Sequence, residues 1–106
     1  MWLYHKAMIN ILIVCTNEPI AATIARLIDK VEDWHATIAL SLNDAMGNCY
    51  AKTFEVILIG SGITQAQEDI LKLHLEKLKA SSAVVKHYGG GSGLLYAEIY
   101  QALATK

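Results

Sequence analysis

The chain has 106 residues and a formal net charge of −1, with 54% hydrophobic and 18% charged residues. A chain of this length has room for one domain with its own hydrophobic core, and we take residues 1–106 as a single domain. Nine basic residues are scattered along it, without the clustered positive charge of a nucleic-acid-binding surface. We therefore expect no nucleic-acid partner.

The sequence shows no targeting or membrane signal. No apolar run reaches the roughly 20 residues that a membrane-spanning helix needs, and the first residues lack a secretory cleavage pattern. The two cysteines, Cys15 and Cys49, lack the spacing of a CxxC motif. These features predict a cytoplasmic protein that does not contact membranes. Residues 1–8 precede the first strand pattern and are interpreted as an N-terminal extension.

The segment from Ile11 to Pro19 predicts a buried strand that ends in a small polar turn and leads into a helix. Proline suits the first position of a helix, because the N–H that it lacks would have no partner there. Apolar residues then recur at helical spacing: Ile20, Ile24, Leu27, Ile28 and Val31. The chain therefore opens with a strand followed by a helix.

A second unit is predicted over residues 35–52. His35 to Leu40 alternates loosely between polar and apolar residues, as in a strand. Ser41 and the polar residues after it can cap a short helix that runs to about Lys52. Gly47 lowers the helix propensity of this segment, which makes it the weakest helix in the sequence.

The third unit has the clearest local signals. Phe54 to Ile59 is a nearly continuous aliphatic run, typical of a central parallel strand, and Gly60 to Gly62 ends it. Thr64 followed by Gln67 predicts a capping box at the start of a helix that runs to about residue 80. The apolar stripe of that helix comprises Ile70, Leu71, Leu75 and Leu78.

The fourth unit closes the chain. Ala83 to Val85 predicts a short strand, and the small residues from Gly89 to Gly93 predict a turn. A last helix follows, marked by Leu94, Leu95, Ile99, Tyr100 and Leu103.

Four strand and helix pairs in succession favour the α/β class, in a three-layer doubly wound arrangement with an all-parallel sheet. Right-handed crossovers that wind first one way and then the other from the first strand give the order 2-1-3-4, as in flavodoxin-like folds. The sequence therefore predicts a four-stranded parallel sheet of this order.

The Ile11–Pro19 motif and its spacing to the Phe54–Ile59 strand resemble the front half of bacterial response-regulator receiver domains. That family has five strand and helix units, and it uses acidic residues after the first strand for magnesium and an aspartate after the third strand as phosphoryl acceptor. Here Cys15 and Thr16 occupy the metal positions and Gly60 the acceptor position. The resemblance implies a degenerate receiver-like domain with a signalling role, which aspartyl phosphorylation cannot switch. Lys86 ends a strand as the receiver lysine does.

A second similarity covers the back half of the chain. The strand, glycine turn and helix around residues 54–63, with the glycine passage near Gly89, look similar to the C-terminal half of cobalamin-binding domains. The Asp-x-His-x-x-Gly loop of that family is absent after the first strand, so no histidine is available there as a cobalt ligand. We expect shared architecture from this similarity, and no cofactor.

Open α/β folds bind ligands at the carboxyl ends of their strands, where both glycine loops fall. Glycine N–H groups and helix N-termini there can hold a small anion. The candidate ligand-binding residues are Cys15, Thr16, Asn17, Gly60, Ser61, Gly62, His87, Gly89, Gly90, Gly91 and Ser92. Positive φ angles are predicted in the second glycine loop, together with a position facing the Gly60 turn. The simpler interpretation is that the glycines only make tight turns between strands and helices.

Two residues of this set carry reactive groups. His87 can act as a general acid or base or bind an anion, or it can simply end a strand with a hydrogen bond. Cys15 lies near a helix N-terminus and is either a reactive thiol or a small buried hydrophobe. No acid that could orient His87 is evident in the sequence, so we assign no catalytic residue and no metal ligand.

Two classes of function remain. The first is a non-phosphorylatable regulatory or protein-interaction module of pseudo-receiver type, which binds a protein partner or self-associates as a homodimer through its last helix or a sheet edge. The second is a small-anion-binding protein or minor enzyme that uses the glycine loops. The lost carboxylates and the front-half resemblance favour the first class.

Overall fold

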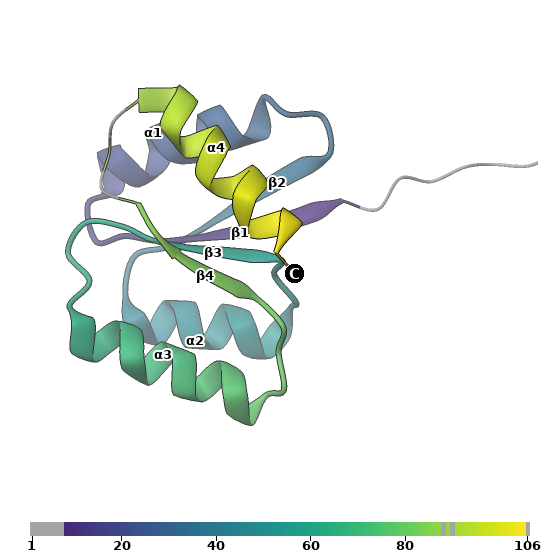
Figure 1. The fold of residues 1–106 in the computed structure, drawn as a ribbon. Helices are drawn as coiled ribbons and strands as arrows, with labels where there is room; N and C mark the ends of the chain where they lie inside the picture. Colours follow the sequence, from purple (N-terminus) through teal and green to yellow (C-terminus); the bar gives the residue numbers. More distant parts are fainter. Residues whose placement is uncertain (1–7, 88, 90, 106) are drawn as a thin grey trace, which may run out of the picture.

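The computed structural model describes residues 8–87, 89 and 91–105 of the chain. Four strands, β1 (Ile9–Val14), β2 (Trp34–Ala39), β3 (Val56–Ile59) and β4 (Ala83–Lys86), form one sheet in the order β2-β1-β3-β4 (Figure 1). All three neighbouring pairs are parallel. The predicted fold class, strand order and strand direction are confirmed. The described residues contain no helix long and apolar enough to cross a membrane.

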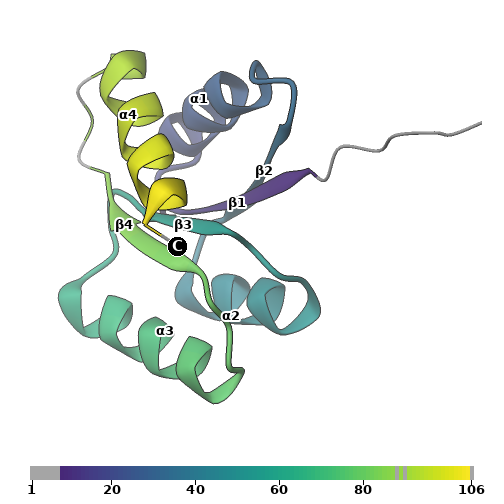
Figure 2. The same ribbon diagram turned by 45° about the vertical axis from the view of Figure 1, so that its right-hand side comes forward.

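Four helices cover the two faces of this sheet. They are α1 (Glu18–Asp29), α2 (Leu42–Ala51), α3 (Gln65–Lys77) and α4 (Gly91–Ala104). Helices α1 and α4 lie on one face, and α2 and α3 lie on the other, as Figures 1 and 2 show from two directions. The three-layer doubly wound arrangement is therefore confirmed, with α4 returning to the face that α1 covers.

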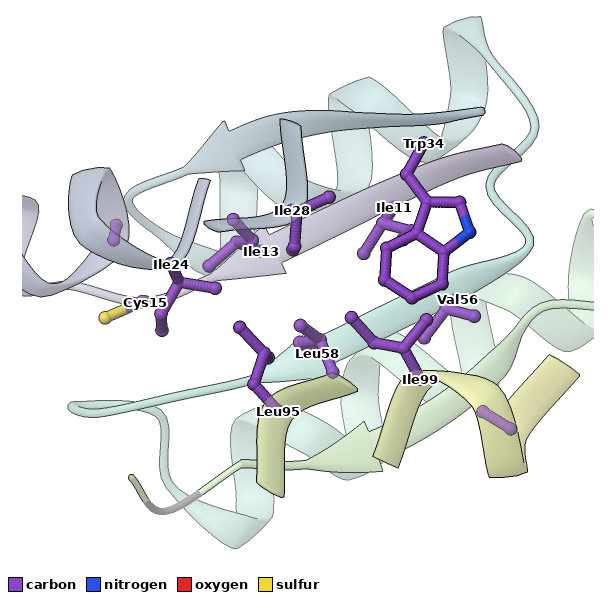
Figure 3. Packing of buried hydrophobic residues seen from close by; sticks show 12 residues of the cluster. Ile11, Ile13, Cys15, Ile24, Ile28, Trp34, Val56, Leu58, Leu95 and Ile99 are labelled. Atoms are coloured by element: carbon purple, nitrogen blue, oxygen red, sulfur yellow. The ribbon is translucent and has the colours of Figure 1, made fainter. Parts of the chain in front are cut away.

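Alternating side chains of β1 and β3 form the two halves of the core. Ile11, Ile13 and Cys15 point to the α1 and α4 face, where a first cluster gathers around Trp34 and Ile99 (Figure 3). Leu12 and Val14 point the other way, into a second cluster with residues of α2 and α3. Both faces of the central strands are thus buried, which explains why their sequences read as continuous aliphatic runs.

Side chains before three of the helices fix where those helices begin. Asn17, Ser41 and Thr64 each accept a hydrogen bond from a backbone N–H of the first turn that follows. At α3 the capping box is complete, because the Gln67 side chain also accepts from the Thr64 N–H at 3.0 Å. Pro19 is the second residue of α1, one position later than predicted.

Two details of the helices differ from the sequence-based expectation. The last helix begins at Gly91, so Gly91 to Gly93 belong to its first turn and not to a separate loop. Several apolar residues on the predicted helical stripes and strands are more than a third exposed: Ile20, Leu40, Ile70, Leu78, Leu94 and Tyr100. In α1, α3 and α4 the apolar spacing thus marks a wider arc of the helix than the arc that the sheet covers.

Candidate functional site

The carboxyl ends of β1 and β3 are joined by contacts between the turns that follow them. Thr16 donates to the Ser61 carbonyl through both its N–H, at 3.0 Å, and its hydroxyl, at 3.3 Å. The N–H of Gly60 donates to the Val14 carbonyl at 2.8 Å. These bonds place the Gly60–Gly62 turn directly against the turn that contains residues 15–17.

Position 62 requires a glycine for two reasons, its backbone conformation and the atoms that surround it. Its φ is +88°, and a Cβ at this position would lie 1.7 Å from Oγ1 of Thr16. Gly60 also has little room, since a Cβ there would lie 3.2 Å from Cβ of Cys15. The glycines of this turn therefore allow two strand ends to approach closely.

Cys15 is fully buried beneath Gly60, in the first core cluster. Its Sγ lies 3.5 Å from the Asn17 carbonyl, to which the thiol donates a weak hydrogen bond. Asn17 itself uses its side chain to cap α1, accepting from the Ile20 N–H at 3.1 Å. These three residues hold the turn together, and no carboxylate occupies the positions that follow β1 or β3.

The second glycine loop has the predicted backbone conformation where the structure describes it. Gly89 has a φ of +96° and Gly91 a φ of +88°. Gly90 lies outside the described residues. Ser92 is exposed in the first turn of α4. Positive φ at Gly89 and Gly91 is thus confirmed.

His87 follows β4 directly and is only 8% exposed. Its N–H donates to the Ile59 carbonyl at 2.9 Å, which extends the pairing of β4 with β3 by one residue. Its ring Nδ1 lies 2.5 Å from Oε1 of Glu98 on α4. The expectation that no acid orients this histidine is therefore wrong. Glu98 faces β4 from the second turn of α4, a position that depends on where that helix packs.

A cleft of about 710 Å³ opens between α1 and α4 at this edge of the sheet. The residues that line it come from α1, the β3–α3 turn, the segment after β4, and α4. They are Pro19, Ile20, Thr23, Ile24, Leu27, Gly60, Ser61, Gly62, Ile63, His87, Gly89, Gly91 and Leu95. Both glycine turns and His87 thus face one cavity.

The cleft gathers only part of the predicted residue set. Gly60, Ser61, Gly62, His87, Gly89 and Gly91 border it, whereas Cys15, Thr16, Asn17 and Ser92 are not among its lining residues. The walls from α1 and α4 escaped sequence reasoning, because the helical spacing of Ile20, Ile24 and Leu27 is equally typical of a purely structural core stripe.

Lys86 and Thr64 also lie at the carboxyl ends of the strands, but next to α3 on the opposite face of the sheet. Lys86 bonds Oε1 of Gln65 at 2.6 Å and pairs with the buried carboxylate of Glu68 at 3.6 Å. Glu68 also pairs with Lys72 at 2.9 Å, and this hydrogen bond raises the pKa of Lys72. Thr64 caps α3, as expected.

Comparison with known proteins identifies similar folds and no family. No protein-family model matches the sequence, and no curated protein matches it. One similar structure is a fusion protein with the yeast Spc42 trimeric coiled coil, with a TM-score of 0.75 and 18% identity over 91% of this chain and 79% of that one. Another is a chain from the phosphorylated P1 domain of CheA3 in complex with CheY6 from R. sphaeroides, with a TM-score of 0.70 and 18% identity. That alignment covers 91% of this chain and 97% of the other. At this identity the likeness concerns the fold.

Proposed function

We propose that the chain is a non-phosphorylatable regulatory module of receiver type, which works by binding protein and associates with a second copy of itself. The proposal rests on the residues that stand at the carboxyl ends of β1 and β3. The strands and turns of the fold are present there, yet a buried thiol and a glycine with little room for a side chain stand where phosphoryl chemistry needs carboxylates. Such a domain retains its surfaces for recognition.

The outer edge of β4 is the surface that suits association. The N–H groups of Ala83 and His87 donate to β3 carbonyls at 3.0 and 2.9 Å. Because these groups alternate in direction along a strand, those of Val84 and Lys86 point away from β3. Among the described residues no further strand pairs with β4. A sheet edge of this kind can accept another strand.

A groove of about 530 Å³ runs along this edge between α3 and α4. Its charged lining residues carry both signs: Glu68, Lys72, Lys86 and Glu98. A two-fold axis through Val85 would place Val84 of each copy opposite Lys86 of the other, so that all their outward N–H and C=O groups pair. The two acidic and two basic residues of the groove balance in charge, so a second copy would meet no net like charge there, which favours it as the occupant.

Sedimentation velocity of the full chain over a concentration series tests the proposal. Wild type should shift from monomer to dimer as concentration rises. Val84→Pro removes an outward N–H and should remain monomeric, since proline is tolerated on an edge strand. Val84→Thr keeps both the N–H and the side-chain shape, and should dimerise like wild type. A wild-type chain that stays monomeric throughout, or a proline variant that dimerises equally well, would contradict the proposal.

A further inference from the structure

The cleft between α1 and α4 has the size and wall composition of a small-molecule site. Its volume of about 710 Å³ falls within the range of roughly 300–1,000 Å³ that is usual for ligand pockets. Aliphatic side chains from both helices form its walls, including Ile24, Leu27 and Leu95. Ile20 adds an apolar side chain that is 44% exposed. An occupant of this cleft therefore needs a mainly apolar body.

One buried polar group borders this apolar space. His87 is more than nine-tenths buried, and the only hydrogen bond of its ring to a described residue joins Nδ1 to Glu98. A carboxylate accepts hydrogen bonds, so it holds the proton on Nδ1. In the neutral ring Nε2 is then an acceptor, and a bound molecule can satisfy it with an O–H group.

The charges around the cleft discriminate between classes of ligand. Among its described lining residues there is no lysine, arginine, aspartate or glutamate. The nearest charge behind His87 is the carboxylate of Glu98, whose side chain is 20% exposed. When the His87 ring is neutral, the Glu98 carboxylate keeps its full negative charge, and a ligand carboxylate beside it would meet no lysine or arginine among the described lining residues, which is costly. A neutral hydroxyl avoids that cost.

We propose that the α1/α4 cleft binds a small neutral molecule with an apolar body and one hydroxyl group, which donates its hydrogen bond to Nε2 of His87. This site does not depend on the β4 edge and stands independently of the function proposed above. Gly89 and Gly91, which line the cleft close to the histidine, contribute no side chains to it.

Three probes of similar size separate the contributions of the body and the polar group: 4-propylphenol, propylbenzene and 4-propylbenzoate. Their affinities for the full chain are measured by calorimetry and by amide shifts in NMR spectra. We expect the phenol to bind about tenfold more tightly than the hydrocarbon, as one hydrogen bond provides. The benzoate should bind less tightly than the phenol.

Variants locate the site. His87→Phe keeps a ring of similar shape without Nε2, and should abolish the preference for the phenol over the hydrocarbon. Thr23→Phe places a ring in the cleft from an exposed position of α1 and should abolish binding of all three probes. Ala22→Phe is the matched control, since Ala22 is also exposed on α1 but does not line the cleft; this variant should bind like wild type.

Several outcomes would overturn the proposal. These are equal affinities for phenol and hydrocarbon, tightest binding of the benzoate, undetectable binding of every probe, or a Thr23→Phe chain that binds like Ala22→Phe. If the His87→Phe chain fails to fold, the wild-type probe ratios and the Thr23→Phe and Ala22→Phe pair still decide the question.

Discussion

The Thr16 hydroxyl occupies the space that any side chain at residue 62 would need. A Cβ on Gly62 would lie only 1.7 Å from Thr16 Oγ1, and the backbone there has a φ of +88°. The same threonine bonds the Ser61 carbonyl through both of its donors. These bonds hold the carboxyl ends of β1 and β3 together. The close contact makes the Gly60–Gly62 turn intolerant of a side chain at position 62.

Gly62→Ala should therefore lower the free energy of unfolding by about 2 kcal/mol or more, from the positive φ and the displaced threonine together. Urea denaturation followed by circular dichroism measures the loss. Adding Thr16→Ala should recover part of it, because the 1.7 Å contact with Oγ1 is removed while the 2.9 Å contact with Cβ of residue 16 and the φ strain remain. A Gly62→Ala chain as stable as wild type would contradict the packing described here.

Gly47 provides the matched control for that substitution. It lies inside α2, and a Cβ there would have no atom within 4 Å among the described residues. Gly47→Ala should raise the free energy of unfolding by about 0.5–1 kcal/mol, through helix propensity alone. The two substitutions should thus change the free energy of unfolding in opposite directions, which distinguishes a position that requires glycine from one that only tolerates it.

Incubation with acetyl phosphate should leave the chain unmodified, because Cys15, Thr16 and Gly60 replace the carboxylates on which receiver chemistry depends. Magnesium should likewise bind only weakly. Intact-mass spectrometry reads the first outcome and a fluorescence titration the second. Appearance of a phosphorylated species that hydroxylamine cleaves would show an acyl phosphate and contradict this expectation.

Tyr96, a residue of α4, should stabilise the chain by capping the C-terminal end of α1. Its hydroxyl donates to the Leu27 carbonyl at 2.8 Å, in the last turn of α1 where carbonyls lack helical partners. Tyr96→Phe should cost about 1 kcal/mol in chemical denaturation. Tyr50→Phe, at a side chain that is 71% exposed, should change stability by much less. Equal effects at the two positions would exclude this capping role.

Cys49 should make the stability fall at alkaline pH. Burial raises the pKa of its thiol, so the unfolded chain ionises at a lower pH than the folded chain. Its contribution to stability is complete below the unfolded pKa and is lost as pH rises from that value to the folded one. The difference between wild type and Cys49→Ala, measured by denaturation at several pH values, isolates this contribution. A difference that does not change across that pH window would contradict the expectation.

Local patterns predicted the fold well, because its signals lie within short segments. The aliphatic run of β3 and the Thr64–Gln67 capping box both depend on residues that are neighbours in sequence. The start of α4 was less predictable, because Gly91 and Gly93 have low helix propensity and are equally typical of a turn.

The candidate site was predicted only in part, for a related reason. The glycine turns and His87 follow strands, so the topology brings them to one edge. Glu98 reaches His87 only because α4 returns to the α1 face, and no local pattern encodes that return. The apolar walls of the cleft could not be predicted from the sequence either. Their residues, such as Ile24 and Leu95, have the same spacing as ordinary core residues of a helix.

The position of α4 at the end of the described chain also has a kinetic consequence. Within the described residues α4 leads into no strand of the sheet. It is held by side-chain packing that includes Leu95, Ile99 and Ala102, by contacts of Tyr96 and Tyr100 with the Trp34 ring, and by the hydrogen bonds of Glu98 and Tyr96. Detachment of α4 breaks none of the interstrand hydrogen bonds. Its amides should therefore exchange with solvent through a subglobal opening, ahead of those of β1, which pair on both sides. We therefore expect the last helix to open as a separate cooperative unit, whose release would uncover one face of β3 while the sheet remains hydrogen-bonded.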